Sequence, residues 1–88
     1  MKISGKKREK ISEQVLGYLF SISPKAIFTS HIAEEIARDE EFMKTLLIEL
    51  KTKGLISEIK KNPEGVLYSR RSRWKLTEKA YNIYKQHQ

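Results

Sequence analysis

The sequence has no cysteine, and its two histidines lie far apart, at positions 31 and 87. The absence of cysteine excludes disulfide bonds and thiolate metal sites, which fits a reducing, intracellular compartment. The isolated histidines offer no cluster that could hold a metal or act as a general base. No Gly-rich phosphate loop and no nucleophile–base pattern is present, so we expect no enzyme, no metal site and no cofactor.

Long apolar runs are also missing. No segment approaches the roughly 20 apolar residues that span a bilayer, and no apolar stretch of the kind found in secretory signals follows the lysines of MKISGKKREK. We therefore expect a cytoplasmic protein with no membrane partner. The 88 residues, 39% of them hydrophobic, suffice for one small domain over residues 1–88. Within it, residues 1–7 are either a basic arm or a frayed terminus.

Positive charge is what the sequence has in excess. It contains 18 Lys and Arg against 11 Asp and Glu, a formal net charge of +7. Residues 1–13 and 51–75 are basic, whereas residues 31–50 carry six acidic groups against two basic ones. A basic balance of this size favours a polyanionic partner, most often nucleic acid. The acidic middle must be explained by the same function.

Apolar periodicity predicts three helices in the first half of the chain. The first covers residues 6–22 and stops before Pro24. A short apolar run at 26–28 is a candidate strand, after which Thr29 or Ser30 is expected to cap a helix over 31–37. Asp39 is expected to cap the third helix, 40–53, and Gly54 to end it. The buried stripe of that helix is Met43, Leu46, Leu47 and Leu50.

The period then changes from helix to strand. Residues 55–61 read as a strand, 62–65 as a turn with Pro second and Gly fourth, and 66–76 as the returning strand. Thr77 is expected to cap a last helix over 78–88. The predicted fold class is therefore mainly α with a small β-hairpin, in the order α-β-α-α-β-β-α. Two short helices followed by a basic hairpin are the plan of a winged helix-turn-helix.

Three segments carry a family resemblance: SHIAEEIA, LLIELKTKGLI and WKLTEKAYNIY. Over roughly residues 8–86 the sequence resembles the winged-helix transcription regulators, in the company of the PadR-like and MarR-like families and small archaeal regulators. Ala80 stands where these proteins commonly have Gly, and Arg38 stands where they have an apolar residue. The resemblance implies sequence-specific binding to double-stranded DNA, regulation of transcription and a homodimer.

The third helix would then be the recognition helix in the major groove. Lys44 and Thr45 suit contacts to phosphates or base edges, and Ile48 suits a thymine methyl group. Glu40 and Glu41 are exposed on the same helix, where phosphates would repel them. They either complement the helix dipole or accept a hydrogen bond from cytosine.

The hairpin 55–76 would be the wing, and the stretch SRRSRWKLT lies on its returning strand. Alternation along a strand puts Tyr68, Trp74 and Leu76 on one face, to anchor the hairpin, and Arg71, Arg73 and Lys75 on the other. The predicted DNA contacts of the wing are Lys60, Lys61, Arg70, Arg71 and Arg73. The alternative is that these charges only protect a sheet edge from aggregation.

The apolar arc of the first helix predicts a two-fold dimer interface shared with the last helix. Its candidate residues are Ile11, Val15, Tyr18, Ile22, Ile83 and Tyr84. The alternative is that both helices cover only their own core.

The sequence thus predicts a nucleoid-associated regulator with no evident small-molecule effector. Two alternatives stay open: a winged-helix adaptor that binds a basic protein, and a non-specific nucleoid or RNA-binding protein.

Overall fold

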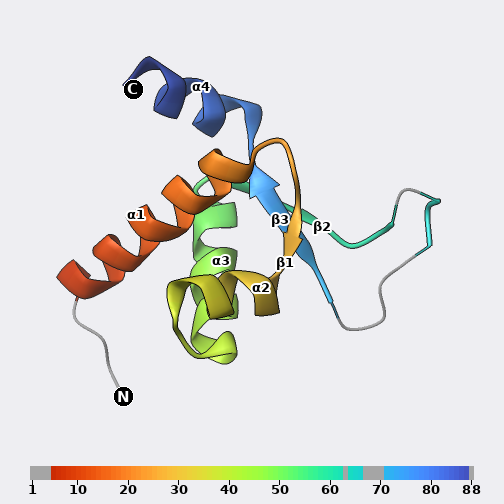
Figure 1. The fold of residues 1–88 in the computed structure, drawn as a ribbon, viewed down its shortest axis with the longest axis horizontal. Coiled ribbons are helices and arrows are strands. Elements are labelled where there is room, and N and C mark those ends of the chain that lie inside the picture. Colours follow the sequence, from red (N-terminus) through yellow and green to blue (C-terminus); the bar gives the residue numbers. More distant parts are fainter. Residues whose placement is uncertain (1–4, 63, 67–70, 88) are drawn as a thin grey trace.

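The computed structural model describes residues 5–62, 64–66 and 71–87. The elements follow the predicted order (Figure 1): α1 (Gly5–Ile22), β1 (Ile27–Phe28), α2 (Thr29–Ile36), α3 (Glu40–Thr52), β2 (Ile56–Ile59), β3 (Arg73–Leu76) and α4 (Glu78–Gln86). In Figure 1, α1 runs across α3, and α4 lies beyond the C-terminal end of α1. The segment that follows β2 projects away from the helices. The fold is mainly α with a small antiparallel sheet, as predicted.

The sheet joins the short strand β1 to the hairpin. Its order is β1-β3-β2, and both pairings are antiparallel. Trp74 of β3 lies between Ile27 on one side and Glu58 on the other. The central strand is therefore tied to the start of α2 as well as to its hairpin partner.

Trp74 is the largest buried side chain, with 1% of its surface exposed. Its indole Nε1 donates a hydrogen bond of 2.8 Å to the hydroxyl of Thr29, so its polar atom is satisfied. Leu76, two residues along the strand, is also buried. Arg73, before Trp74, and Lys75, between Trp74 and Leu76, are only half-buried. The predicted alternation is confirmed for residues 73–76. Tyr68 lies outside the described residues.

The core is shared by all four helices and the sheet. Around Trp74 it comprises Ile11, Val15, Leu16, Leu19, Ile27, Ile32, Ala33, Met43, Leu46, Leu47, Leu50, Ile56, Leu76 and Ala80. The predicted stripe of the third helix is buried here. Ile11 and Val15 are 2% and 0% exposed within the single chain, so assigning them to a dimer interface was wrong. A helical apolar stripe looks the same whether it faces a core or a partner.

Two of the three predicted helix caps are confirmed. The side chain of Asp39 accepts from the amide of Phe42, and that of Thr77 accepts from the amide of Ala80. The predicted cap of α2 is wrong, because Phe28 holds the N-cap position and makes no side-chain cap. Thr29 is already helical, and its hydroxyl accepts the bond from Trp74 instead.

A residue in the left-handed conformation follows both α2 and α3. Gly54 follows α3 with φ +77°, and the amides of Gly54 and Leu55 donate to the carbonyls of Lys51 and Leu50. Ala37 does the same after α2 with φ 59°, although it carries a Cβ. This conformation is natural for glycine and strained for alanine. The tight turn between α2 and α3 is therefore built at an energetic cost.

The hairpin strands are shorter than the predicted spans 55–61 and 66–76. The turn at its tip is confirmed, since the amide of Gly65 donates to the carbonyl of Asn62 at 2.9 Å and Gly65 has φ +86°. Arg70 and the other residues of 67–70 lie outside the described residues.

Candidate nucleic-acid interface

A groove of about 720 Å³ runs between α3 and the hairpin. Along α3 it is lined by Glu40, Glu41, Lys44, Ile48 and Lys51, and from the hairpin by Glu58, Lys60, Arg71, Ser72 and Trp74. Phe28 at the end of β1 and Thr29 and Ser30 at the start of α2 complete its lining. The groove therefore brings together the two predicted binding elements, which lie apart in the sequence.

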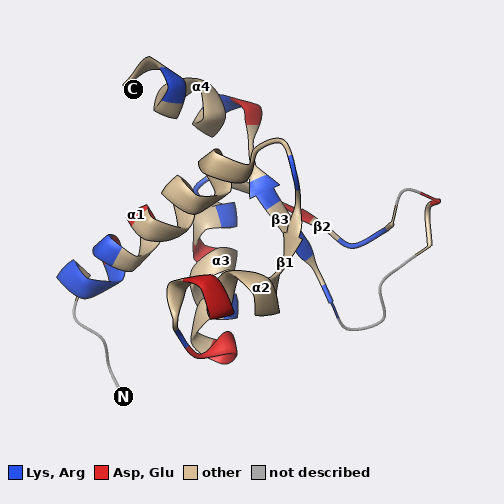
Figure 2. Cartoon of the chain, in the orientation of Figure 1, with Lys and Arg blue, Asp and Glu red and all other residues tan. Residues whose placement is uncertain are grey.

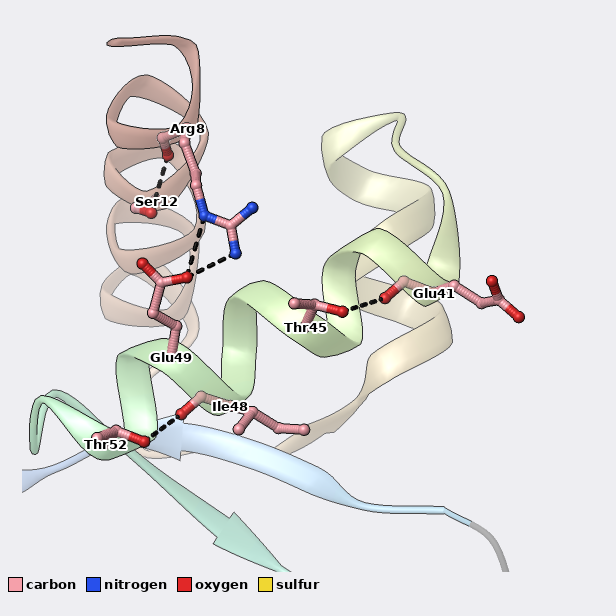
Figure 3. A network of polar contacts seen from close by, with 7 residues as sticks. All are labelled: Arg8, Ser12, Glu41, Thr45, Ile48, Glu49 and Thr52. Atoms are coloured by element: carbon pink, nitrogen blue, oxygen red, sulfur yellow. Dashed lines mark hydrogen bonds and ion pairs between the residues drawn. The ribbon is translucent and has the colours of Figure 1, made fainter. Parts of the chain in front are cut away.

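The outward face of α3 is as the helical period predicted. Lys44 and Thr45 are exposed, and Ile48 has 46% of its surface exposed, although it is large and apolar. Lys44 and Ile48 line the groove. The hydroxyl of Thr45 donates to the carbonyl of Glu41 one turn earlier at 3.1 Å (Figure 3).

The exposed cations among the described hairpin residues differ in whether they line the groove. Lys60 and Arg71 are exposed and line the groove, and the guanidinium carbon of Arg71 lies 5.5 Å from the ring centre of Phe28. Lys61 is exposed but does not line the groove. Arg71 is thus held over an aromatic ring with its charge still accessible.

Arg73 has a structural contact that sequence reasoning missed. Its Nε and one terminal nitrogen donate to the carbonyl of Ala26 at 3.2 and 3.0 Å, and its guanidinium carbon lies 5.9 Å from the ring centre of Phe28. The alternation rule correctly put Arg73 on the face opposite Trp74. The pairing of β3 with β1, which places Phe28 opposite Arg73, supplies the backbone acceptor.

A carboxylate sits in the groove wall. Glu58 on β2 accepts a hydrogen bond from Lys51 of α3 at 2.8 Å and another from the hydroxyl of Ser72. Burial acts to raise the pKa of Glu58, but the bonds from Lys51 and Ser72 outweigh it and lower the pKa below its ordinary value. Glu58 is therefore ionised and neutralises the charge of Lys51. This ion pair ties α3 to the hairpin.

The opposite flank of α3 is tied to α1. The guanidinium of Arg8 donates from Nε to the carboxylate of Glu49 at 3.0 Å and makes a second bond to it through a terminal nitrogen (Figure 3). Its guanidinium carbon also lies 5.4 Å from the ring centre of Phe42. The hydrogen bond from Arg8 lowers the pKa of Glu49 below its ordinary value. Arg8 is thus engaged with the protein itself.

The remaining predicted dimer residues lie at the surface of α1 and α4. Ile83 is 44% exposed, and Tyr18, Ile22 and Tyr84 are half-buried. Burial, with a smaller contribution from the charge of Glu13, raises the pKa of Tyr84. Tyr18, Ile22 and Tyr84 pack against the core with part of each side chain exposed, and Ile83 is exposed.

The distribution of charge follows the elements (Figure 2). Basic residues mark the start of α1 and the hairpin, and acidic residues gather at the turn into α3. Over the described ranges, no group of three or more His, Asp and Glu side chains is placed to hold a metal ion. No helix in the described part of the chain is long and apolar enough to cross a membrane.

These features define a class of fold. Two helices joined by a tight turn, followed by an antiparallel hairpin whose central strand is buried against them, form a winged helix-turn-helix. This is the fold that the resemblance implied.

Solved structures of transcription regulators share this fold. The S. aureus MepR–DNA complex superimposes with a TM-score of 0.75 at 20% identity over 93% of this chain and 64% of MepR. A double mutant of ZitR from Lactococcus lactis gives 0.71 at 23% identity over 99% of this chain and 51% of ZitR. PcaV from Streptomyces coelicolor, solved with its natural ligand, gives 0.64 at 18% identity over 88% and 49%.

These neighbours are winged-helix regulators of the MarR family, and the chain shares their winged-helix fold. It spans only between about half and two thirds of their length. No protein-family model and no curated protein matches the sequence.

Proposed function

We propose that the protein is a transcription regulator that binds double-stranded DNA at particular sequences, with α3 in the major groove and the hairpin 55–76 as a basic wing. The observation that carries the proposal is the groove, which sets the exposed Lys44 and Ile48 of α3 beside Lys60 and Arg71 of the hairpin. An α-helix with its side chains is about 10–12 Å across, which fits a major groove about 12 Å wide. Its setting would be the cytoplasm, at the nucleoid.

The roles of the residues follow from their chemistry. Lys44 and Thr45 would contact phosphates or base edges, and Ile48 a thymine methyl group. Lys60, Lys61 and Arg71 would contact phosphates or a narrow minor groove, for which the planar guanidinium is suited. The fold of a MepR–DNA complex supports DNA as the partner.

The proposed active form is a two-fold homodimer through α1 and α4, with the exposed Ile83 and the half-buried Tyr18, Ile22 and Tyr84 at the interface. Such a dimer would set two copies of α3 about 34–36 Å apart, or at a multiple of this spacing, to match successive turns of DNA. Light scattering tests it: the protein should have twice the mass of the chain, and Ile83→Asp should be a monomer. A monomeric wild type at high concentration would remove the dimer from the proposal.

Gel-shift titration with random and genomic duplexes at several salt concentrations tests the function. A regulator prefers some genomic fragments, a non-specific nucleoid protein shifts all duplexes equally, and an adaptor shifts none. In the double variant Lys44→Ala/Arg71→Ala, each lost phosphate contact should flatten the log–log salt slope by about 0.9. The matched control is Lys79→Ala/Lys85→Ala on α4, which removes the same charge outside the groove. If the salt slope flattened equally in both double variants, the proposed site would be contradicted.

One observation favours the adaptor as a second candidate. Glu40 and Glu41 line the groove together with the cations, so a protein segment of mixed charge also fits its electrostatics. Absence of any shift at low salt would favour this candidate.

A further inference from the structure

One stripe of α3 faces the groove, and it carries three different chemistries. Glu41, Lys44 and Ile48 are spaced at i, i+3 and i+7, which puts them on one side of the helix, and all three line the groove. All three side chains are exposed. Reading toward the C-terminus, the stripe presents a hydrogen-bond acceptor, a donor and an apolar group.

Lys51, the next residue along this stripe, is not free to bind a ligand. Lys51 donates to Glu58 at 2.8 Å, so its charge is neutralised within the groove wall. Glu41 differs, because its carboxylate makes no hydrogen bond or ion pair with any residue that the structure describes. In Figure 3 this carboxylate points away from the contact between Arg8 and Glu49, and Glu41 is exposed.

The charges along the groove are therefore polarised. With Lys51 neutralised, the accessible cations are Lys44, Lys60 and Arg71, and the carboxylates of Glu40 and Glu41 stand at the N-terminal end of α3. Phosphates are drawn to the cations and repelled from that end. If α3 enters a major groove, its acidic end is best placed over base edges, where the amino group of cytosine is the donor that carboxylates accept from.

Resting on the proposed function, we infer that Glu41 determines sequence specificity by accepting a hydrogen bond from the N4 amino group of a cytosine. At a rise of about 1.5 Å per residue, Glu41 and Ile48 are about 10 Å apart along the helix, which is about three base pairs at 3.4 Å each. The bound site should then contain a cytosine facing Glu41 and, about three base pairs away, a thymine facing Ile48. Lys44 lies between them, where it suits guanine.

Substitution by glutamine gives a sharp test, because the side chain keeps its shape and changes its preferred base. Glutamine pairs with adenine through N6 and N7. Sites are selected from a random duplex library with the wild type and with Glu41→Gln, and the affinities of the C and A versions of the selected site are then measured. Glu41→Gln should change the C-to-A affinity ratio by about tenfold or more at one position and leave the other positions unchanged.

Glu40→Gln is the matched comparison, since it removes the same charge from the same turn of α3, at the neighbouring position that also lines the groove. It should raise affinity for all duplexes slightly and keep the preference for cytosine. Circular dichroism checks that both variants are folded.

The outcomes distinguish failure of the inference about Glu41 from failure of the proposed function. A wild type that selects no site contradicts the proposed function itself. A wild type that selects a site, with Glu41→Gln selecting the same site, overturns the role of Glu41 and leaves the function standing. An equal change of preference in Glu40→Gln and Glu41→Gln also overturns it, because the effect would then be one of charge alone.

Discussion

We expect Arg73 to hold the wing in place. This structural role differs from that of Arg71, which lies two residues away and is exposed. The guanidinium of Arg73 donates two bonds to the carbonyl of Ala26, a residue that is 8% exposed. Arg73→Ala removes a charged donor from an acceptor that water reaches poorly. Hydrogen bonds to charged groups contribute about 1.5–3 kcal/mol. Because the new space lets some water reach the carbonyl, we expect the lower part of that range, about 1.5–2 kcal/mol.

This loss is large enough to measure in a domain of 88 residues. At about 4–8 °C per kcal/mol, the melting temperature should fall by about 6–16 °C. Trp74 is the only tryptophan and is buried, so its fluorescence reports unfolding in urea or on heating. Arg71→Ala is the control. It loses an exposed contact with Phe28 and should cost less than about 1 kcal/mol.

Salt titration and a charge-preserving variant complete the test. Arg71→Ala should flatten the salt slope of DNA binding by about 0.9, whereas Arg73→Ala should leave it nearly unchanged. Arg73→Lys keeps the charge but loses the planar fork, so it should be destabilised like the alanine variant. The reasoning fails if Arg73→Ala is as stable as Arg71→Ala, or if lysine restores full stability.

Three further predictions concern stability. Ala37→Gly should stabilise the protein by about 0.5–1 kcal/mol in urea unfolding, since glycine adopts φ 59° without strain; a loss of stability would contradict the strained turn. Trp74→Ala should cost about 3–5 kcal/mol in urea unfolding followed by circular dichroism, since this variant has no tryptophan, and a cost below that of Arg73→Ala would contradict its place in the core. The lowered pKa of Glu49 means that its pairing with Arg8 stabilises the fold above pH 4.5 and is lost as the pH falls below it. The stability difference between wild type and Glu49→Gln should therefore shrink on acidification, and a difference independent of pH would refute this.

The exposed residues of α3 in the candidate site could be predicted from the sequence. The contacts between the residues that line the groove could not. The period of the third helix put Lys44, Thr45 and Ile48 outside because Met43 and its apolar neighbours had to be inside, and this is confirmed. The partner of each wall residue depends on distances across the fold. Glu58 shows this, since nothing near it in the sequence indicates that it binds Lys51 on one side and Ser72 on the other.

What the sequence determined by itself is local. Element order, the caps at Asp39 and Thr77, the stop at Gly54 and the burial of Trp74 follow from periodicity and backbone preference, which act over a few residues. Only the tertiary structure decided that Thr29 accepts from Trp74, 45 positions along the chain, instead of capping its helix. It likewise put Arg73 on a backbone carbonyl of residue 26 and buried Ile11 in the core instead of at an interface. A side chain contacts the groups that the folded chain brings near it. Its residue type limits which of these it can bind but does not determine which are near.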